Sequence, residues 1–273
     1  MCVGTVTATS PVVPTELADA LRGAESGRTP IEPLTAAHPD LSTAQAYAVQ
    51  RINVARRAAA GAQLRGRKLG ITSRASQAVL GVSEPTFGTL MSDMFIEDGD
   101  DVPVDSLIAP RVEAELAFVM AHDLSGPGRT TLDAARAIDC VVPVIEIGDS
   151  RIAGWRIKVA DSVADNASSA RVVLGPAPVP LSPALDVSHL GVLFCRNGIA
   201  IDSGAGAAVL GNPVRAVAWA ANKLAEFDDR LRAGDLVLSG ALHRMVPVRP
   251  GDLFTARFAR LGDVSVRFTR VEP

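Results

Sequence analysis

The chain has 273 residues, 48% of them hydrophobic and 21% charged, with a formal net charge of −3. A chain of this length and composition can bury a substantial core, either in one large domain or in a small domain plus a larger one. The small net charge and the aromatic content of only 4% argue against a nucleic-acid partner, because nucleic-acid binders usually carry a basic patch and stacking aromatics.

Cysteine spacing and hydropathy indicate the cellular setting. Cys2, Cys140 and Cys195 lie far apart, without the spacing of a disulfide framework or a thiolate metal site. No stretch approaches the roughly 20 apolar residues of a membrane span, and the N-terminus shows no secretory signal. We therefore expect a cytoplasmic protein without a membrane partner.

The first part of the chain has helical spacing. Two segments carry it, TELADALRGAESG and LSTAQAYAVQRINVARRAAAG. Ser42 can cap the second helix, and Gly61 can end it. These patterns predict a helical N-terminal region over residues 1–62, followed by a catalytic β-rich domain over residues 63–273.

After residue 62 the chain turns to short β-rich runs separated by Gly, Asp and Pro. Asn197-Gly198 in CRNGIA predicts a hairpin, and RLGD at residues 260–263 predicts a second one. Helices are predicted within TLDAARAID and NPVRAVAWAANKLAEF. Strands outnumber helices and there is no regular βαβα alternation, so the pattern predicts an α+β fold and not a doubly wound sheet.

The predicted strand at residues 110–120, PRVEAELAFVM, carries two carboxylates in apolar surroundings. Glu113 and Glu115 project from one face, roughly 6 to 7 Å apart by the rise per residue. Two ionised carboxylates so placed repel one another unless a cation lies between them or water screens them. For two such acids alone, a water-exposed strand face is the commoner arrangement.

A third acid favours the metal interpretation. Glu146 lies in VVPVIEIGD, a second strand too apolar to hold an unpaired charge. Three carboxylates on two buried strands predict a site for a hard divalent cation. Mg²⁺ is the first expectation and Mn²⁺ the second, because no His or Cys supplies a softer ligand.

Other motifs leave alternatives open. Lys68, in GRKLGITS, can extend to the surface, or it can be partly buried as a general acid–base or a carboxylate partner. The polar segment DSVADNASSA at residues 161–170 can simply turn the backbone or can line a pocket. GAGAAVLGNP lacks the third glycine of a dinucleotide motif, where Val209 stands, and is predicted to be a loop before a helix.

Several ordered motifs resemble those of the 2-hydroxypenta-2,4-dienoate (2-keto-4-pentenoate) hydratases. Related enzymes are the 4-oxalocrotonate decarboxylases and the 2-oxohept-4-ene-1,7-dioate hydratases, all in the fumarylacetoacetate hydrolase superfamily. The resemblance covers residues 64–269, and the N-terminal helices fit more loosely. It rests on GRKLGITSRASQAVLGVSEPTFGTLMSDM, PRVEAELAFV, PVIEIGDSRIAGWRIKVADSVADNASS, GAGAAVLGNPVRAVAWAANKL and LRAGDLVLSGAL.

The resemblance implies a mixed β-sheet roll with a helical N-terminal region. It implies that Glu113, Glu115 and Glu146 hold Mg²⁺ or Mn²⁺, and that Lys68 and Ser168 are catalytic. Further residues are implied to contact the substrate: Ser73, Thr86 and Ser239. There is one departure, because many relatives carry PDYG or PDFG where this chain reads PTFG, with Thr86 in place of the acid.

The activity implied is hydration of 2-hydroxypenta-2,4-dienoate, or a close 2-oxo-enoate, to 4-hydroxy-2-oxopentanoate in meta-cleavage catabolism of aromatics or steroids. Decarboxylation of a 2-oxo-diacid of the 4-oxalocrotonate type uses the same chelate and is the main alternative. Hydrolysis of an acylpyruvate is less favoured, because no Glu follows His38 at the short spacing expected there. A non-enzymatic binding role would need no cation. Relatives also imply a homo-oligomer that can associate with a pathway enzyme.

Overall fold

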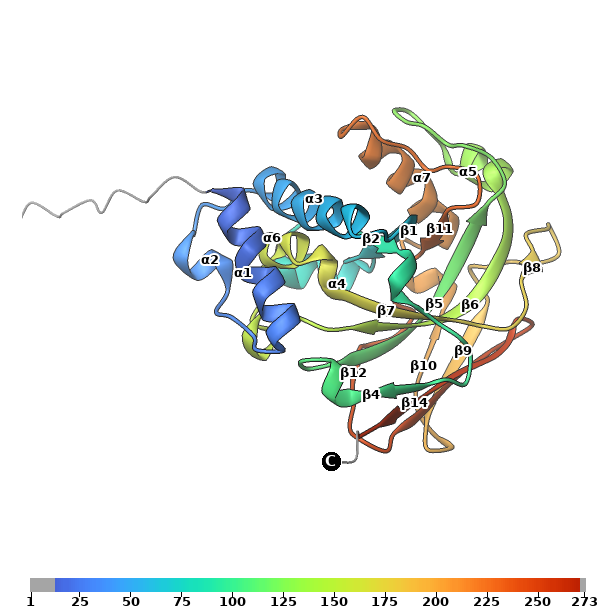
Figure 1. The fold of residues 1–273 in the computed structure, drawn as a ribbon. Helices are drawn as coiled ribbons and strands as arrows, with labels where there is room; N and C mark the ends of the chain where they lie inside the picture. The colour runs from blue at the N-terminus through green and yellow to red at the C-terminus, as the bar shows by residue number, and fades with distance from the viewer. Residues whose placement is uncertain (1–12, 271–273) are drawn as a thin grey trace, which may run out of the picture.

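The computed structural model describes residues 13–270 and contains two β-sheets, with the N-terminal helices together on one side and other helices elsewhere around the sheets (Figure 1). The α-helices are α1 (Pro14–Gly27), α2 (Leu34–Ala37), α3 (Thr43–Ala59), α4 (Arg74–Leu80), α5 (Thr131–Ala137), α6 (Val159–Ala164) and α7 (Pro213–Ala225). None of the described helices is long and apolar enough to cross a membrane.

The two predicted N-terminal helices are present as α1 and α3. Ser42 caps α3 through a capping box: its Oγ accepts from the Gln45 backbone N–H at 3.3 Å, and Gln45 Oε1 accepts from the Ser42 N–H at 3.0 Å. Gln50 on α3 also donates to the carbonyls of Phe87 (3.0 Å) and Val163 (2.8 Å). The helical region therefore shares buried polar contacts with the rest of the chain, and a domain boundary at residue 62 stays a prediction.

The larger sheet is mixed, in the order β2-β1-β11-β5-β6-β7-β3, with β12 paired to β5 and β8 to β6. Strands β1 and β11 run parallel, whereas β5 and β6 pair antiparallel along most of their length. The strands are β1 (Leu64–Gly70), β2 (Thr86–Met91), β3 (Phe95–Ile96), β5 (Arg111–Met120), β6 (Ile138–Gly148), β7 (Ser169–Leu174), β8 (Val179–Pro180), β11 (Leu236–Leu238) and β12 (Val246–Pro247).

The smaller sheet contains both predicted hairpins, in the order β10-β9-β13-β14-β4. Asn197 and Gly198 join β9 to β10 with positive φ angles of 51° and 80°, as a two-residue hairpin turn requires. The RLGD run joins β13 to β14. The strands are β4 (Asp101–Pro103), β9 (Gly191–Arg196), β10 (Ile199–Ala205), β13 (Leu253–Phe258) and β14 (Gly262–Thr269).

The two faces of β5 belong to different apolar clusters. The face that carries Val112, Ala114, Leu116 and Phe118 joins the large core, which also includes Phe254 and Phe268 of the smaller sheet. The opposite face contributes Ala117 to a smaller cluster with Leu90 and Val144. Glu113 and Glu115 project from this second face, so both are enclosed by protein and not wetted by solvent. The α+β prediction is confirmed, with mixed pairing in the larger sheet.

Candidate metal centre and active-site cavity

The three acids are brought together by strand register. Glu113 on β5 lies directly opposite Glu146 on β6, and Glu115 is two residues further along the same face. Each offers a carboxylate oxygen within 4.8 Å of the others. Glu113 is 6% exposed and the other two are 0% exposed, which excludes screening by bulk water. The pleat of a single antiparallel pair thus builds the cluster.

The carboxylate oxygens lack enough donors within the described part of the chain. Glu115 Oε2 accepts the Gly240 backbone N–H at 2.7 Å. The other oxygen of Glu115 and Oε2 of Glu146 are buried and receive no hydrogen bond from a described residue, and Glu146 Oε1 has only the Lys68 ammonium at 3.1 Å. Buried acceptors without partners are costly unless another group satisfies them. An all-oxygen donor set with unsatisfied lone pairs fits a hard divalent cation, so the cluster is able to bind one.

Gly240 supplies its N–H from a backbone conformation that excludes a side chain. Its φ is +103°, and a Cβ at this position would lie 2.1 Å from Thr72 Oγ1. The neighbouring residue Ser239 is fully buried, and its hydroxyl donates to the Gly240 carbonyl at 3.3 Å. The turn after β11 therefore positions a main-chain donor on Glu115.

Lys68 lies beside the cluster and does not extend to the surface. Register aligns Lys68 on β1 with Leu238 and Ala117, which places it on the same face of the sheet as the acids. Its Nζ is 3.1 Å from Glu146 Oε1 and donates to the Ala167 carbonyl at 3.0 Å. Burial alone would lower the pKa of Lys68, but the negative charges of Glu146, Glu113 and Glu115 outweigh burial and raise this pKa. The ammonium therefore stays protonated beside the carboxylates.

A cavity of about 650 Å³ opens over this cluster. Lys68, Glu113 and Ser168 line one part of its wall. The volume lies within the range of small-molecule sites, roughly 300 to 1,000 Å³. Most of the remaining wall is apolar and includes Leu69, Ile71, Val79, Leu80, Trp155 and Met245.

The structure separates the residues expected to contact substrate into two groups. Ser73 and Ser168 line the cavity, and Ser73 also caps α4 by accepting the Ser76 N–H at 3.0 Å. Thr86 and Ser239 are buried and are not among the lining residues. Thr86 Oγ1 has no hydrogen-bond partner among the described residues. A substrate role for each of the four stays a prediction.

His243 also lines the cavity. Its Nε2 accepts the Ala114 N–H at 3.0 Å, and its Nδ1 lies 2.8 Å from the Arg244 carbonyl. These contacts require a proton on Nδ1 and a bare Nε2. Burial lowers the pKa of His243, which favours the same neutral tautomer. Both ring nitrogens are thus engaged in holding the loop to β5.

The acids predict a pH-dependent cation affinity. Burial, followed by the charge of Glu146, raises the pKa of Glu113 to about 7. Burial and the charges of Glu146 and Glu113 raise the pKa of Glu115 well above its usual value. Below pH 7 a cation must displace at least one proton from the carboxylates. We therefore expect the Kd for Mn²⁺ to rise about tenfold for each pH unit by which the pH falls below 7.

Calorimetric titration of Mn²⁺ at pH 6, 7 and 8 measures this dependence. Buffers with different ionisation enthalpies report the number of protons released on binding. A Kd that is constant over this range, with no proton release, would contradict the raised pKa values.

The chain is similar to several known enzymes. The chain is 45% identical over 254 residues to a 2-keto-4-pentenoate hydratase of Paraburkholderia xenovorans, covering 93% of this chain and 94% of that protein. It is 42% identical over 260 residues to the 2-oxo-hept-4-ene-1,7-dioate hydratase of Escherichia coli, covering 93% and 97%. Multiple relatives of this kind are hydro-lyases.

A solved structure also matches closely. The 4-oxalocrotonate decarboxylase of Pseudomonas putida G7, complexed with magnesium and adipate, superposes with a TM-score of 0.89 at 37% identity, covering 94% of this chain and 99% of that chain. The family model for the fumarylacetoacetate (FAA) hydrolase C-terminal domain matches residues 55–269. The chain belongs to the fumarylacetoacetate hydrolase family.

Proposed function

We propose that this chain is a divalent-metal-dependent hydratase that adds water to 2-hydroxypenta-2,4-dienoate, or to a close 2-oxo-enoate, to give 4-hydroxy-2-oxopentanoate. One observation carries the proposal: three buried carboxylates and a buried lysine form one cluster, and Glu113 and Lys68 of this cluster line a largely apolar cavity. The hydratase relatives supply the reaction class. We propose Mg²⁺ as the cation and Mn²⁺ as the second choice.

The reaction adds one water and moves two protons. The 2-hydroxyl of the dienol loses a proton while C5 gains one, which gives a conjugated 2-oxo-3-enoate. The oxygen of water then bonds to C4, C3 takes a proton, and the water gives up one proton. A cation held by Glu113, Glu115 and Glu146 would stabilise the negative charge on the C2 oxygen as a Lewis acid.

The chain's own groups can serve the proton steps. Lys68 is held protonated by the surrounding carboxylates, so its Nζ can deliver a proton and take it back. Ser168 lies on the same wall of the cavity, and its hydroxyl also reaches Asp165 Oδ2 at 3.4 Å. We assign Lys68 the proton transfer and Ser168 a hydrogen bond to the substrate. The apolar wall limits bulk water near the reacting carbons.

The cavity wall favours hydration over decarboxylation of a diacid. A second carboxylate on the substrate would need a buried cationic partner away from the metal cluster. The cationic lining residues apart from Lys68 are Lys158 and Arg244, and both are exposed to solvent. A short dienoate without a second charge suits this wall better. The decarboxylase remains the second candidate because its solved structure superposes with a TM-score of 0.89.

The decisive assay follows loss of the diene absorbance of freshly made 2-hydroxypenta-2,4-dienoate, with Mg²⁺ or Mn²⁺ and then with excess EDTA. We expect turnover that EDTA abolishes and fresh metal restores, with 4-hydroxy-2-oxopentanoate as the product. The same preparation is offered 4-oxalocrotonate, and release of CO₂ is measured. Faster CO₂ release than hydration would replace the first candidate with the second.

Assembly remains a proposal of its own. We propose a homo-oligomer because three large apolar side chains are exposed on the β9–β10 hairpin, namely Leu193 (42%), Ile199 (71%) and Ile201 (40%). Association with a pathway enzyme and a cytoplasmic location are further expectations from the resemblance.

A further inference from the structure

The loop that contacts Lys68 has an unfavourable backbone. Asn166, Ala167 and Ser168 follow one another with φ angles of 52°, 52° and 55°. Residues with a Cβ rarely adopt this left-handed conformation, and three in succession are more unfavourable still. The surrounding structure must therefore hold the loop in place.

One anchor of the loop is the side-chain amide of Asn166, which bonds to the backbone of β2. Asn166 Oδ1 accepts the Thr89 N–H at 2.7 Å, and Asn166 Nδ2 donates to the Thr89 carbonyl at 3.0 Å. Close approach is possible because Gly88 has no side chain: a Cβ there would lie 2.4 Å from the Asn166 carbonyl oxygen. This anchor fixes the start of the turn against the sheet.

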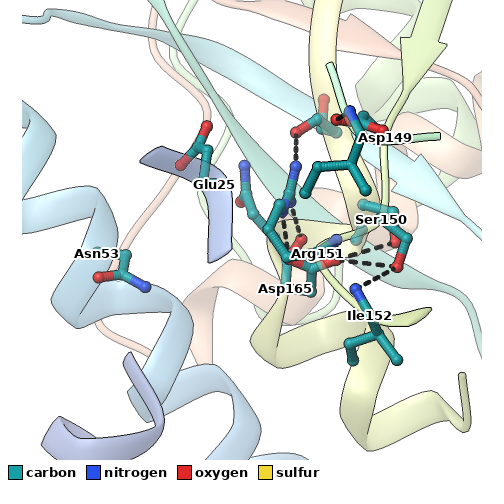
Figure 2. Close-up of polar contacts among 12 residues, drawn as sticks. Glu25, Asn53, Asp149, Ser150, Arg151, Ile152 and Asp165 are labelled. Carbon is teal, nitrogen blue, oxygen red and sulfur yellow. Dashed lines mark hydrogen bonds and ion pairs between the residues drawn. The ribbon is translucent and has the colours of Figure 1, made fainter. Parts of the chain in front are cut away.

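The other anchor is a buried ion pair between Arg151 and Asp165 (Figure 2). Arg151 donates through Nε to the Asp165 carboxylate and through Nη2 to the Asp165 carbonyl at 2.6 Å. Its Nη1 donates to the Ser169 carbonyl at 3.3 Å. Asp165 directly precedes the left-handed turn and Ser169 directly follows it, so one guanidinium clamps both ends.

The clamped turn contacts Lys68, the proposed catalytic lysine. The Ala167 carbonyl accepts from Lys68 Nζ, and Ala167 and Ser168 line the cavity. Arg151 and Asp165 do not line that cavity, and they are 5% and 2% exposed. Both residues contact the turn, and the turn contacts the lysine.

Stability alone does not explain a buried ion pair. Desolvation of both charges offsets their attraction, and a well-packed apolar pair of similar volume is often as stable or more stable. What the guanidinium adds is a planar fork with fixed directions. We infer that Arg151 and Asp165 are positioning residues, which hold the Asn166–Ser168 turn so that the Ala167 carbonyl orients the Lys68 ammonium. This inference extends the proposed function, on which the kinetic part of its test rests.

The first test compares Arg151→Lys with the double variant R151M/D165L. Lysine keeps the charge but loses the fork, and the double variant replaces the pair with apolar side chains. We expect both to fold, with kcat lowered about 10- to 100-fold, because a misplacement of about 1 Å can cost 100-fold. The Kd for Mn²⁺ should stay within about threefold in both variants, since neither residue belongs to the carboxylate cluster. KM should stay within about threefold in Arg151→Lys, which keeps the contact between Asp165 Oδ2 and the Ser168 hydroxyl.

The matched control is Arg156→Lys. Arg156 also pairs with a carboxylate, that of Glu32, but the two side chains are 57% and 72% exposed. This variant should leave kcat unchanged. A folded R151M/D165L protein with wild-type kcat would overturn the inference, and so would an equal loss in the Arg156 variant.

A second readout needs no turnover. The chain has three lysines, Lys68, Lys158 and Lys223, so lysine labelled with ¹⁵N at Nζ gives at most three ammonium signals. Hydrogen-bonded buried ammonium protons exchange slowly with water, and we expect a protected Lys68 signal in the wild type, with and without the diamagnetic Mg²⁺. The double variant R151M/D165L, which adds no further lysine, should shift or remove it. An unchanged Lys68 signal in a folded variant would overturn the inference even if the wild type hydrates no dienoate.

Discussion

Glutamine at position 115 is expected to abolish tight binding of the divalent cation and to lower turnover by about a thousandfold. Glu115→Gln keeps the shape of the side chain and an oxygen to accept the Gly240 N–H, but removes one of three negative charges. Loss of an outer-shell partner alone weakens metal affinity about 10- to 100-fold. Loss of a ligand charge should therefore weaken it by more than about 100-fold.

The same substitution should have the opposite effect on the metal-free protein. Glu115 is completely buried, and burial together with the charges of Glu146 and Glu113 already raises its pKa. Glutamine removes that repulsion and leaves the Lys68–Glu146 ion pair intact. We expect metal-free Glu115→Gln to have a Tm at least equal to that of the metal-free wild type, and to lose the increase in Tm that Mn²⁺ produces.

Calorimetric titration and thermal unfolding with and without Mn²⁺ measure both effects. Glu97→Gln is the matched control, because Glu97 is exposed and should change neither property. Wild-type affinity in Glu115→Gln would mean that the cation binds elsewhere and would remove the basis of the proposed function.

The sequence could predict which face of β5 carries the acids, because side-chain alternation along a strand is a local property. It could also identify Glu146 as a charge in an apolar strand. It could not show that Glu146 lies directly opposite Glu113, since register between strands depends on packing along the whole β5–β6 ladder. The hairpins were predictable for the same local reason, through Asn197 and Gly198.

Residues that act through long-range contacts were not predictable in this way. Thr86 and Ser239 were expected from the resemblance to contact the substrate, but both are buried and neither is among the residues that line the cavity. Nothing in the sequence around Arg151 distinguishes it from a surface arginine. In the structure its guanidinium donates to backbone carbonyls of the loop at residues 165–169. The alternatives for Lys68 were also undecided until β1 was placed beside β11, because propensity gives no information on which strands are neighbours.

Methionine at position 68 should separate the catalytic and electrostatic roles of Lys68. Lys68→Met keeps an unbranched side chain but removes the positive charge and the proton. We expect kcat to fall about 100- to 10,000-fold, the range for loss of a general acid–base. Cation affinity should increase, because the carboxylates no longer interact with a competing positive charge. A lower kcat combined with a higher cation affinity is expected when a neighbouring positive charge is removed, whereas removal of a metal ligand should lower both.

The metal-free Lys68→Met protein should also be less stable. Removing one partner of a buried ion pair leaves the other charge uncompensated and costs about 3–5 kcal/mol, and here Glu146 would lose its partner at 3.1 Å. Mn²⁺ should restore much of this loss, because the cation replaces the missing positive charge. Lys68→Arg keeps the charge and should retain stability without restoring full kcat. If Lys68→Met folded with metal and kept wild-type turnover, Lys68 would be a structural counter-charge and the proton steps would require another group.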